Sequence, residues 1–180
     1  MELIKINQER EPLIDDMFAG FKGHLRILHD VEDDEIKDYL GAAIEAIGIF
    51  AGNEIFPTTF KVFYPMDSPD YRLPSSLFGW YCGRWNVSSM VIQDAKDRDV
   101  TGDYTIDYEK GMVYPHPHNM KIELSTGYST AVDVPHNLRI IIYRLGADFY
   151  ENREANRVGE PKMLPGWLTH SLASIWQPRV

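Results

Sequence analysis

Residues 29–53, HDVEDDEIKDYLGAAIEAIGIFAGN, carry the clearest secondary-structure signal in the 180-residue chain. Acidic residues open the segment, where they suit the positive end of a helix dipole. Gly52 and Asn53 close it, as expected for a left-handed helix cap. Between them lies an apolar stripe with a spacing of three and four, formed by Ile36, Tyr39, Leu40, Ala43, Ile44, Ile47 and Phe50. The segment predicts an amphipathic helix that buries one face.

Similar spacing predicts three further helices. Residues 14–28, IDDMFAGFKGHLRIL, predict a short helix interrupted by Gly20 and Gly23, with a stripe formed by Ile14, Phe18, Phe21, Leu25 and Leu28. Residues 133–157 predict a long helix that starts near Pro135, with an inward stripe of Leu138, Ile141, Ile142, Leu145 and Phe149. A last short helix opens at Pro165, contains Trp167, Leu168, Leu172 and Ile175, and stops at Pro178.

The residue composition changes between residues 55 and 130. TTFKVFYP, NVSSMVIQD and MKIELSTGY are rich in β-branched and aromatic residues, and DYEKGMVY has a glycine where a hairpin turn needs one. The sequence therefore predicts an α+β protein. A small bundle of about four helices, from residues 1–54 and 131–180, carries an inserted antiparallel β-module at residues 55–130.

The charge of the chain is uneven. The net charge is −9, and residues 1–54 account for −8 of it. Such acidity argues against a protein that grips nucleic acid through its phosphates. A single cysteine, Cys82, excludes a disulfide framework. No apolar run approaches the roughly 20 residues of a membrane span, and a secretory signal is not evident, so we expect a cytosolic protein without membrane contact.

Catalytic motifs are weak. His116 and His118 lie two residues apart and could offer imidazoles to a metal, with His136 or Asp107 completing the set. This pair supports an alternative function as a small metal-dependent hydrolase or nuclease, although His-Pro-His is also an ordinary turn sequence. No nucleophile elbow, phosphate loop or dinucleotide fingerprint is present. We expect no catalytic residue, no cofactor and no metal site.

Two other features also have plain structural interpretations. The alternating acids of DVEDDE resemble a calcium loop, but Glu35 and Gly41 stand where such a loop needs Gly and Glu. Trp80 and Trp85 are expected to fill the core of the β-module. For Trp167 and Trp176, packing and an interface role stay open.

Two blocks of the sequence resemble the tailed-phage head-tail connector (adaptor) family. The front block, FKGHLRILHDVEDDEIKDYLGAAIEAIGIFAG, has a Lys-x-x-Leu helix, an acidic turn and a helix with paired alanines. The back block has Gly-Tyr, a Val-Pro helix start, Phe-Tyr-Glu-Asn-Arg-Glu at the helix end and Leu-Pro before a short helix. The β-rich insertion resembles that of a longer subgroup of phage proteins to which a DNA-packaging role is attributed.

The resemblance implies a non-enzymatic ring subunit of the virion, present in the host cytoplasm during assembly. Family members typically form dodecamers beneath the portal protein, extend the DNA channel and dock a downstream head-completion or tail protein. A channel that passes double-stranded DNA without binding it should have acidic or neutral walls. The candidate channel-facing residues are Asp30, Glu32, Asp33, Asp34 and Asp38.

The resemblance also suggests two contact regions. Mixed charges at the end of the long helix are candidates for pairing with the next subunit, through Glu151, Arg153, Glu154 and Arg157. The C-terminal segment of such adaptors tends to reach toward the portal. The candidate portal-docking residues are Leu172, Ile175, Trp176, Gln177, Arg179 and Val180.

Overall fold

A computed structural model of the chain describes residues 2–51, 54–64, 87–107, 112–114, 119–152, 166–168 and 171. It confirms the predicted α+β class. The elements follow in the order β1 (Glu2–Gln8), α1 (Glu11–Leu25), α2 (Asp33–Ala51), β2 (Thr58–Tyr64), β3 (Val87–Gln93), a 3-10 turn (Thr101–Asp103), β4 (Thr105–Asp107), β5 (Met112–Tyr114), β6 (Met120–Thr126) and α3 (His136–Glu151). Residues 166–168 are also helical.

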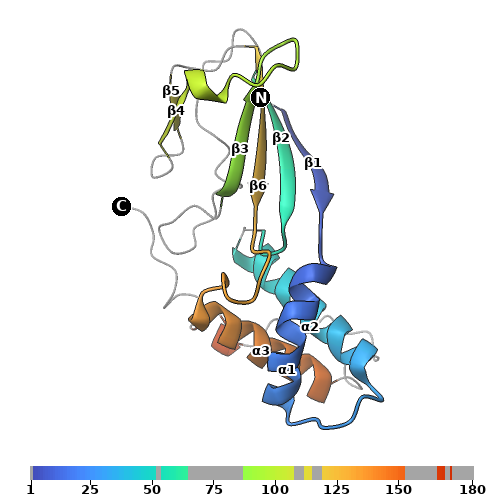
Figure 1. Cartoon of the computed structure of the whole chain (residues 1–180). Coiled ribbons are helices and arrows are strands. Elements are labelled where there is room, and N and C mark those ends of the chain that lie inside the picture. Colours follow the sequence, from blue (N-terminus) through green and yellow to red (C-terminus); the bar gives the residue numbers. More distant parts are fainter. Residues whose placement is uncertain are drawn as a thin grey trace.

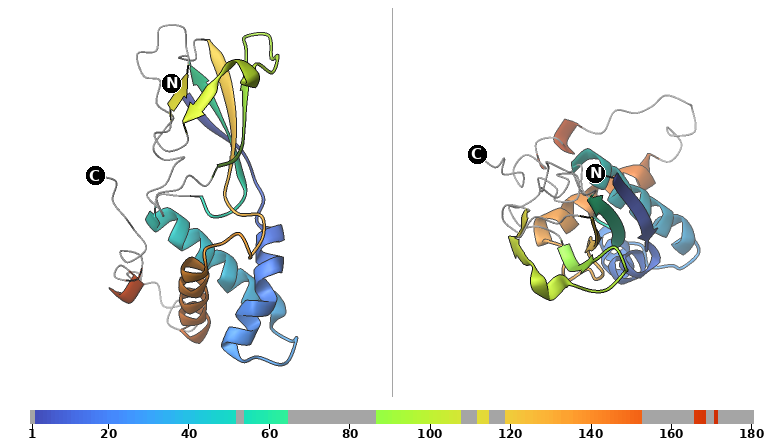
Figure 2. Two further views of the ribbon diagram at one scale, coloured as in Figure 1. Left: turned by 60° about the vertical axis from the view of Figure 1, so that its left-hand side comes forward. Right: turned by 90° about the horizontal axis from the view of Figure 1, so that it is seen from above.

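The molecule is elongated, with the helices at one end and the sheet at the other (Figures 1 and 2). We call α1, α2 and α3 the helical layer. The main sheet is antiparallel, with strand order β1-β2-β6-β3. It stands on the helical layer at the ends of its strands, so that the helices do not cover either of its faces (Figure 1). The two regions therefore bury separate hydrophobic cores.

Strand β1 is a structural feature that the sequence pattern did not indicate. It pairs antiparallel with β2, with Leu3 opposite Val62 and Lys5 opposite Phe60. A bulge interrupts this register between Lys5 and Asn7. The first residues of the predicted helical segment thus complete a sheet whose other strands come from the predicted insertion. The division into a core and an inserted module at residue 55 stays a prediction.

The helical core contains the residues that the apolar stripes predicted. α2 buries Ile36, Leu40, Ala43, Ile44 and Ile47, and α3 buries Leu138, Ile141, Ile142 and Leu145. Both stripes are confirmed, because the buried positions recur at the helical period. α3 ends at Glu151, earlier than predicted, with Asn152 as its cap.

Helix α1 differs from its prediction in two respects. It runs without interruption through Gly20 and Gly23, so the predicted breaks are wrong. Gly20 instead leaves room for Tyr143, whose hydroxyl donates a 3.1 Å hydrogen bond to the backbone oxygen of Met17. The helix ends at Leu25 because Arg26 takes a left-handed conformation, with φ of 59°. Leu28, predicted in the inward stripe, therefore lies beyond the helix and is exposed.

The sheet buries one face. Its core consists of alternate residues of three strands with Val113 of β5, and the set is Phe60, Val62, Met90, Ile92, Val113, Ile122 and Leu124. The predicted strands β2, β3 and β6 are confirmed, and so is the antiparallel pairing of β4 with β5. The alternation follows from the period of two along a strand. The glycine of the predicted hairpin turn lies outside the described residues.

A narrow waist joins the two regions. Here the backbone N–H of Tyr128 donates to the oxygen of Ile55 at 2.9 Å, and that of Glu9 donates to Pro57 at 2.8 Å. Gly127 has a φ of +92°, and a Cβ atom there would lie 2.5 Å from the carbonyl carbon of Phe56. Only glycine adopts this conformation and tolerates this approach readily. Gly127, between β6 and the turn that leads to α3, thus allows the two chain segments of the waist to approach closely.

Candidate functional site

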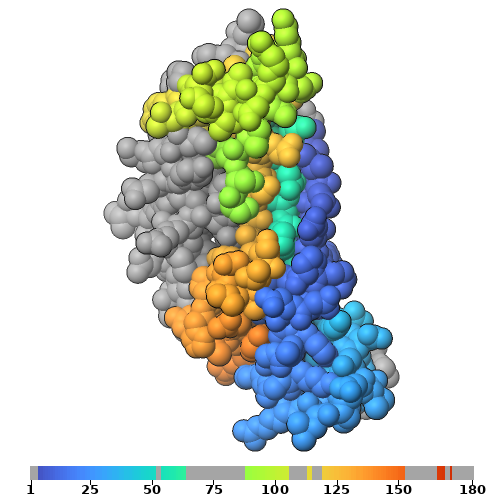
Figure 3. Space-filling view, viewed as in Figure 1, coloured from blue at the N-terminus to red at the C-terminus, as the bar shows by residue number. Residues whose placement is uncertain are grey.

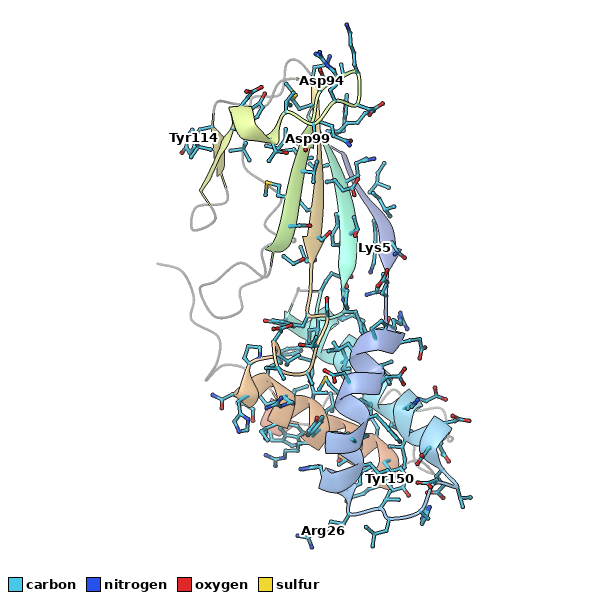
Figure 4. The ribbon with its side chains drawn as sticks, in the orientation of Figure 1. Lys5, Arg26, Asp94, Asp99, Tyr114 and Tyr150 are labelled. Atoms are coloured by element: carbon cyan, nitrogen blue, oxygen red, sulfur yellow. The ribbon has the colours of Figure 1, made fainter. Side chains whose placement is uncertain are left out.

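The acidic residues predicted to face a channel lie in one region of the fold. They occupy the connection between α1 and α2 and the first turns of α2, at the end of the helical layer away from the sheet (Figure 1). Arg26 and Tyr150, labelled in Figure 4, mark this end. The structure therefore brings the five candidate acids together, but it holds them in different ways.

Lys22 of α1 joins two of the acids. Its Nζ lies 2.6 Å from Oδ1 of Asp30 and 2.6 Å from Oδ1 of Asp33. These hydrogen bonds, first to Asp30 and then to Asp33, raise the pKa of Lys22 above its ordinary value. The hydrogen bond from Lys22 in turn lowers the pKa of Asp30. One lysine therefore ties the connection to α1 and holds Asp30 in its charged form.

A tyrosine fixes a third acid. The hydroxyl of Tyr150, near the end of α3, donates to Oε2 of Glu32 at 2.5 Å. Glu32 also accepts through its backbone oxygen the N–H of Ile36, at 2.9 Å, as the first turn of α2 begins. Glu32 and Asp33 are half-buried, so their charges serve contacts within the chain. The connection is pinned to both α1 and α3.

The remaining two acids face solvent. Asp34 and Asp38 are exposed at positions four residues apart on α2, and Glu45 and Ile49 continue the same exposed stripe toward the end of the helix. Glu45 forms a 2.9 Å ion pair with Arg10. The acidic surface available to another molecule therefore consists chiefly of Asp30, Asp34 and Asp38.

The metal-site alternative receives no structural support. His116 and His118 lie outside the described residues, as does the side chain of Asp107, and His136 is the exposed first residue of α3. Within the described ranges, no three His, Cys, Asp or Glu side chains are grouped so that they could hold a metal ion. Among these residues, too, no helix has the length and apolar character needed to cross a membrane.

The predicted contact regions fall largely outside the described residues. Glu151 is exposed as the last residue of α3, but Arg153, Glu154 and Arg157 are not described, nor are the six candidate portal-docking residues between 172 and 180. Trp80, Trp85, Trp176 and Cys82 also lie outside. The proposed roles of these residues remain predictions.

Trp167 is described, and it packs within the chain. It lies partly buried against the helical core, and the guanidinium carbon of Arg144 sits 4.1 Å from its ring centroid. The adjacent Leu168 is fully buried in the same core. Packing, one of the two roles considered for Trp167, is therefore the one the structure shows.

The far end of the sheet carries a second charged site that the sequence did not single out. Asp94 accepts hydrogen bonds from the backbone N–H groups of Lys96 and Arg98, and from Nε of Arg98 at 2.8 Å. The Arg98 hydrogen bonds hold the pKa of Asp94 at about 2. Asp99 accepts the N–H and hydroxyl of Thr101, and the hydroxyl bond chiefly lowers its pKa. Figure 4 shows both aspartates at the tip opposite Arg26.

Three solved structures contain chains of the same fold. A chain in the virion of the native gene transfer agent (GTA) particle has a TM-score of 0.64 and 20% identity. A chain in the neck of the empty GTA particle, computed with C6 symmetry, has 0.63 and 19%. A chain in the neck of the native GTA particle, computed with C12 symmetry, has 0.62 and 18%.

Each match covers 100% of this chain and 97% of the other. No protein-family model and no curated protein matches the sequence. The chain therefore shares its fold with chains of these particles, at 18–20% sequence identity.

Proposed function

We propose that the chain is a structural subunit of the head-tail neck of a tailed-phage-like particle, and that it acts through protein-protein contacts and not as an enzyme. The observation that carries this proposal is the likeness over the full length of both chains to proteins of GTA necks and virions. The motifs of residues 21–52 and 127–180 support the same class independently, because they resemble head-tail connectors in sequence.

In this proposal the subunit forms a ring, a dodecamer in the virion, beneath the portal protein. The ring extends the DNA channel and docks the next connector or tail protein. Rings are built from heterologous interfaces, in which one patch of a subunit meets a different patch of its neighbour. Glu151, Arg153, Glu154 and Arg157 are proposed for that contact, and Arg153→Glu should then reduce ring formation more than stability.

The channel wall is proposed to use the exposed acids of α2. Asp34 and Asp38 lie on one face and form no ion pair with another described residue, whereas Glu32 and Asp33 are held within the chain. Acidic walls suit a channel that lets DNA slide, because basic walls would bind phosphates. A ring structure that places Asp34 and Asp38 on its outer surface would refute this part.

Genetic removal of the chain tests the function as a whole. Particles made without it should accumulate as filled heads without tails, and purified chain added to these heads should restore ring density at the portal vertex in electron micrographs. Purified complete particles that lack the chain would contradict the proposal. Stoichiometric metal in the purified chain, with hydrolase activity lost in His118→Ala, would instead support the metal-dependent enzyme.

A further inference from the structure

The connection between α1 and α2, residues 26–32, exposes two aliphatic side chains almost completely. Leu28 is 98% exposed and Val31 is 89% exposed, the highest values among the large apolar residues that the structure describes. Both belong to a stretch of seven residues at the extreme end of the helical layer (Figures 1 and 3). We call residues 26–32 the knob.

Contacts with α1, with the helical core and with α3 fix the conformation of the knob. Its start is fixed by the left-handed Arg26, and the N–H of Ile27 donates to the oxygen of Lys22 at 3.3 Å. Ile27 itself packs against the helical core. The Lys22 and Tyr150 contacts described above hold Asp30 and Glu32. Ile27 and Glu32 make the inward contacts of the knob, and Leu28 and Val31 face outward.

A pinned segment that exposes apolar side chains is typical of an interaction site. Exposed aliphatic groups are poorly solvated by water, and their burial against a partner lowers the free energy of the complex. A rigid segment also loses little conformational entropy on binding. Two protruding side chains fit a depression in a partner better than a flat surface.

The charge around the knob defines the partner further. Asp30 has a side chain that is 87% exposed, and Asp34 is exposed in the first turn of α2. Arg26 is the one lysine or arginine among residues 26–34, which hold four acids, so the rim is acidic. Acidic rims repel phosphates and attract lysine and arginine, which excludes nucleic acid as the occupant.

The described surface of the chain does not supply such a complement. Nine of the eleven described lysines and arginines already contact an acid, a carbonyl oxygen or an aromatic ring within the chain. A second copy could offer most of its described cations to the knob only by sharing or exchanging these contacts. Among the described residues, the charge pattern therefore favours a different protein over a second copy.

We propose that the knob docks into an apolar depression, rimmed by lysine or arginine, on a non-identical protein of the particle. This inference rests on the proposed neck function and adds the axial contact through which the subunit joins its neighbour along the particle. Leu28 and Val31 supply the contact area, and Asp30 and Asp34 orient the partner through charge.

The test compares the double variant Leu28→Ser/Val31→Ser with the wild-type chain and with two controls. Val132→Ser and Ile49→Ser remove aliphatic groups that are 86% and 77% exposed elsewhere. All variants should have the unfolding temperature of the wild type, because the side chains are outside the core. Leu28→Ile/Val31→Ile keeps the apolar character and should behave as wild type.

Each protein is added to purified heads made without this chain, and two yields are measured: chain bound to heads, and tailed particles formed afterwards. The knob variant should lower one of the two yields by about tenfold or more, while the controls change neither. Asp30→Lys should lower the same yield by a smaller factor, and added salt should weaken the wild type in the same step.

Two results would overturn the inference. Normal yields of the knob variant at both steps would show that the knob binds nothing essential. Sedimentation of the free chain gives the other: if the wild type forms oligomers that the knob variant cannot form, the occupant is a second copy. A wild-type chain that fails to bind heads and to restore tails would instead refute the neck function itself, which separates the two failures.

Discussion

The helical layer and the sheet each bury a hydrophobic core, and the two cores differ in size. The helical core holds 18 buried residues of the described chain, from α1, α2, α3, the waist and Leu168, whereas the sheet core holds seven. The three helices bury their apolar stripes in one shared core, whereas the sheet buries one of its two faces. Because apolar burial drives folding, the helical layer should carry most of the stability and the sheet should depend on it.

The largest loss of stability is expected at the waist. Gly127 lies there between the sheet and the helical layer, so its replacement should affect both regions. Gly127→Ala places a Cβ against the Phe56 backbone at a φ of +92°. It should lower the free energy of unfolding by about 3 kcal/mol, since backbone cannot move aside as a side chain can. Urea denaturation measures this. Gly102→Ala, where a Cβ meets no atom within 4 Å, serves as the control and should be nearly neutral.

A matched pair of core substitutions tests the comparison directly. Ile44 of α2 and Ile122 of β6 are both fully buried, so Ile44→Ala and Ile122→Ala should each cost about 3 kcal/mol locally. Hydrogen exchange should separate them. Ile44→Ala should weaken amide protection in both regions, and Ile122→Ala in the sheet alone. Equal loss of protection everywhere in both variants would mean that the molecule unfolds as one unit.

Two glycines of α1 sharpen the account of the helical layer. At Gly20 a Cβ would lie 2.6 Å from the hydroxyl of Tyr143, whereas at Gly23 it would meet no atom within 4 Å. Gly20→Ala should therefore destabilise the protein by about 1–2 kcal/mol through overpacking. Gly23→Ala should stabilise it by about 0.5–1 kcal/mol, because alanine has the better helix propensity. Thermal unfolding of the two variants should shift in opposite directions.

The smallest effect is confined to the sheet tip. The pKa of Asp94 is held at about 2, below its ordinary 3.8, by Arg98. A lowered carboxyl pKa stabilises the folded form above the ordinary value, and this contribution is lost as pH falls through about 2. The protection factors of the amides of residues 94–101, which correct for the pH dependence of intrinsic exchange, should therefore be steady near pH 5 and fall below pH 4. Asp94→Asn should reduce this pH dependence to the part that Asp99 contributes, and it should leave the helical layer unchanged.

Local patterns predicted most of the helical layer and the long strands. Ile36 to Ile47 on α2 and Leu138 to Leu145 on α3 repeat at the helical period, and that period alone indicates which face is buried. The pattern fails where a distant partner decides. β1 is a strand because β2, more than 50 residues later, pairs with it. Gly20 lies within α1, where the absence of a side chain leaves room for the Tyr143 hydroxyl.

The candidate site shows the same limit. The sequence placed the acids in one segment, but it did not indicate that Lys22 and Tyr150 would fix Asp30 and Glu32, since the tyrosine lies 118 residues away from its partner. Leu28 fits the apolar spacing of α1 and was predicted to face inward. A left-handed Arg26 ends the helix before it, and no residue type at that position announces this conformation.

The waist has a mechanical consequence. Of the described elements, β1 and α1, α2 and β2, and β6 and α3 are each joined by backbone that crosses from one region to the other. A pull along the long axis would load these three connections in parallel, and the packed cores on either side would resist it together. Bending would strain the Glu9–Pro57 and Tyr128–Ile55 hydrogen bonds first. We therefore expect the molecule to resist stretching along its long axis more than bending at the waist.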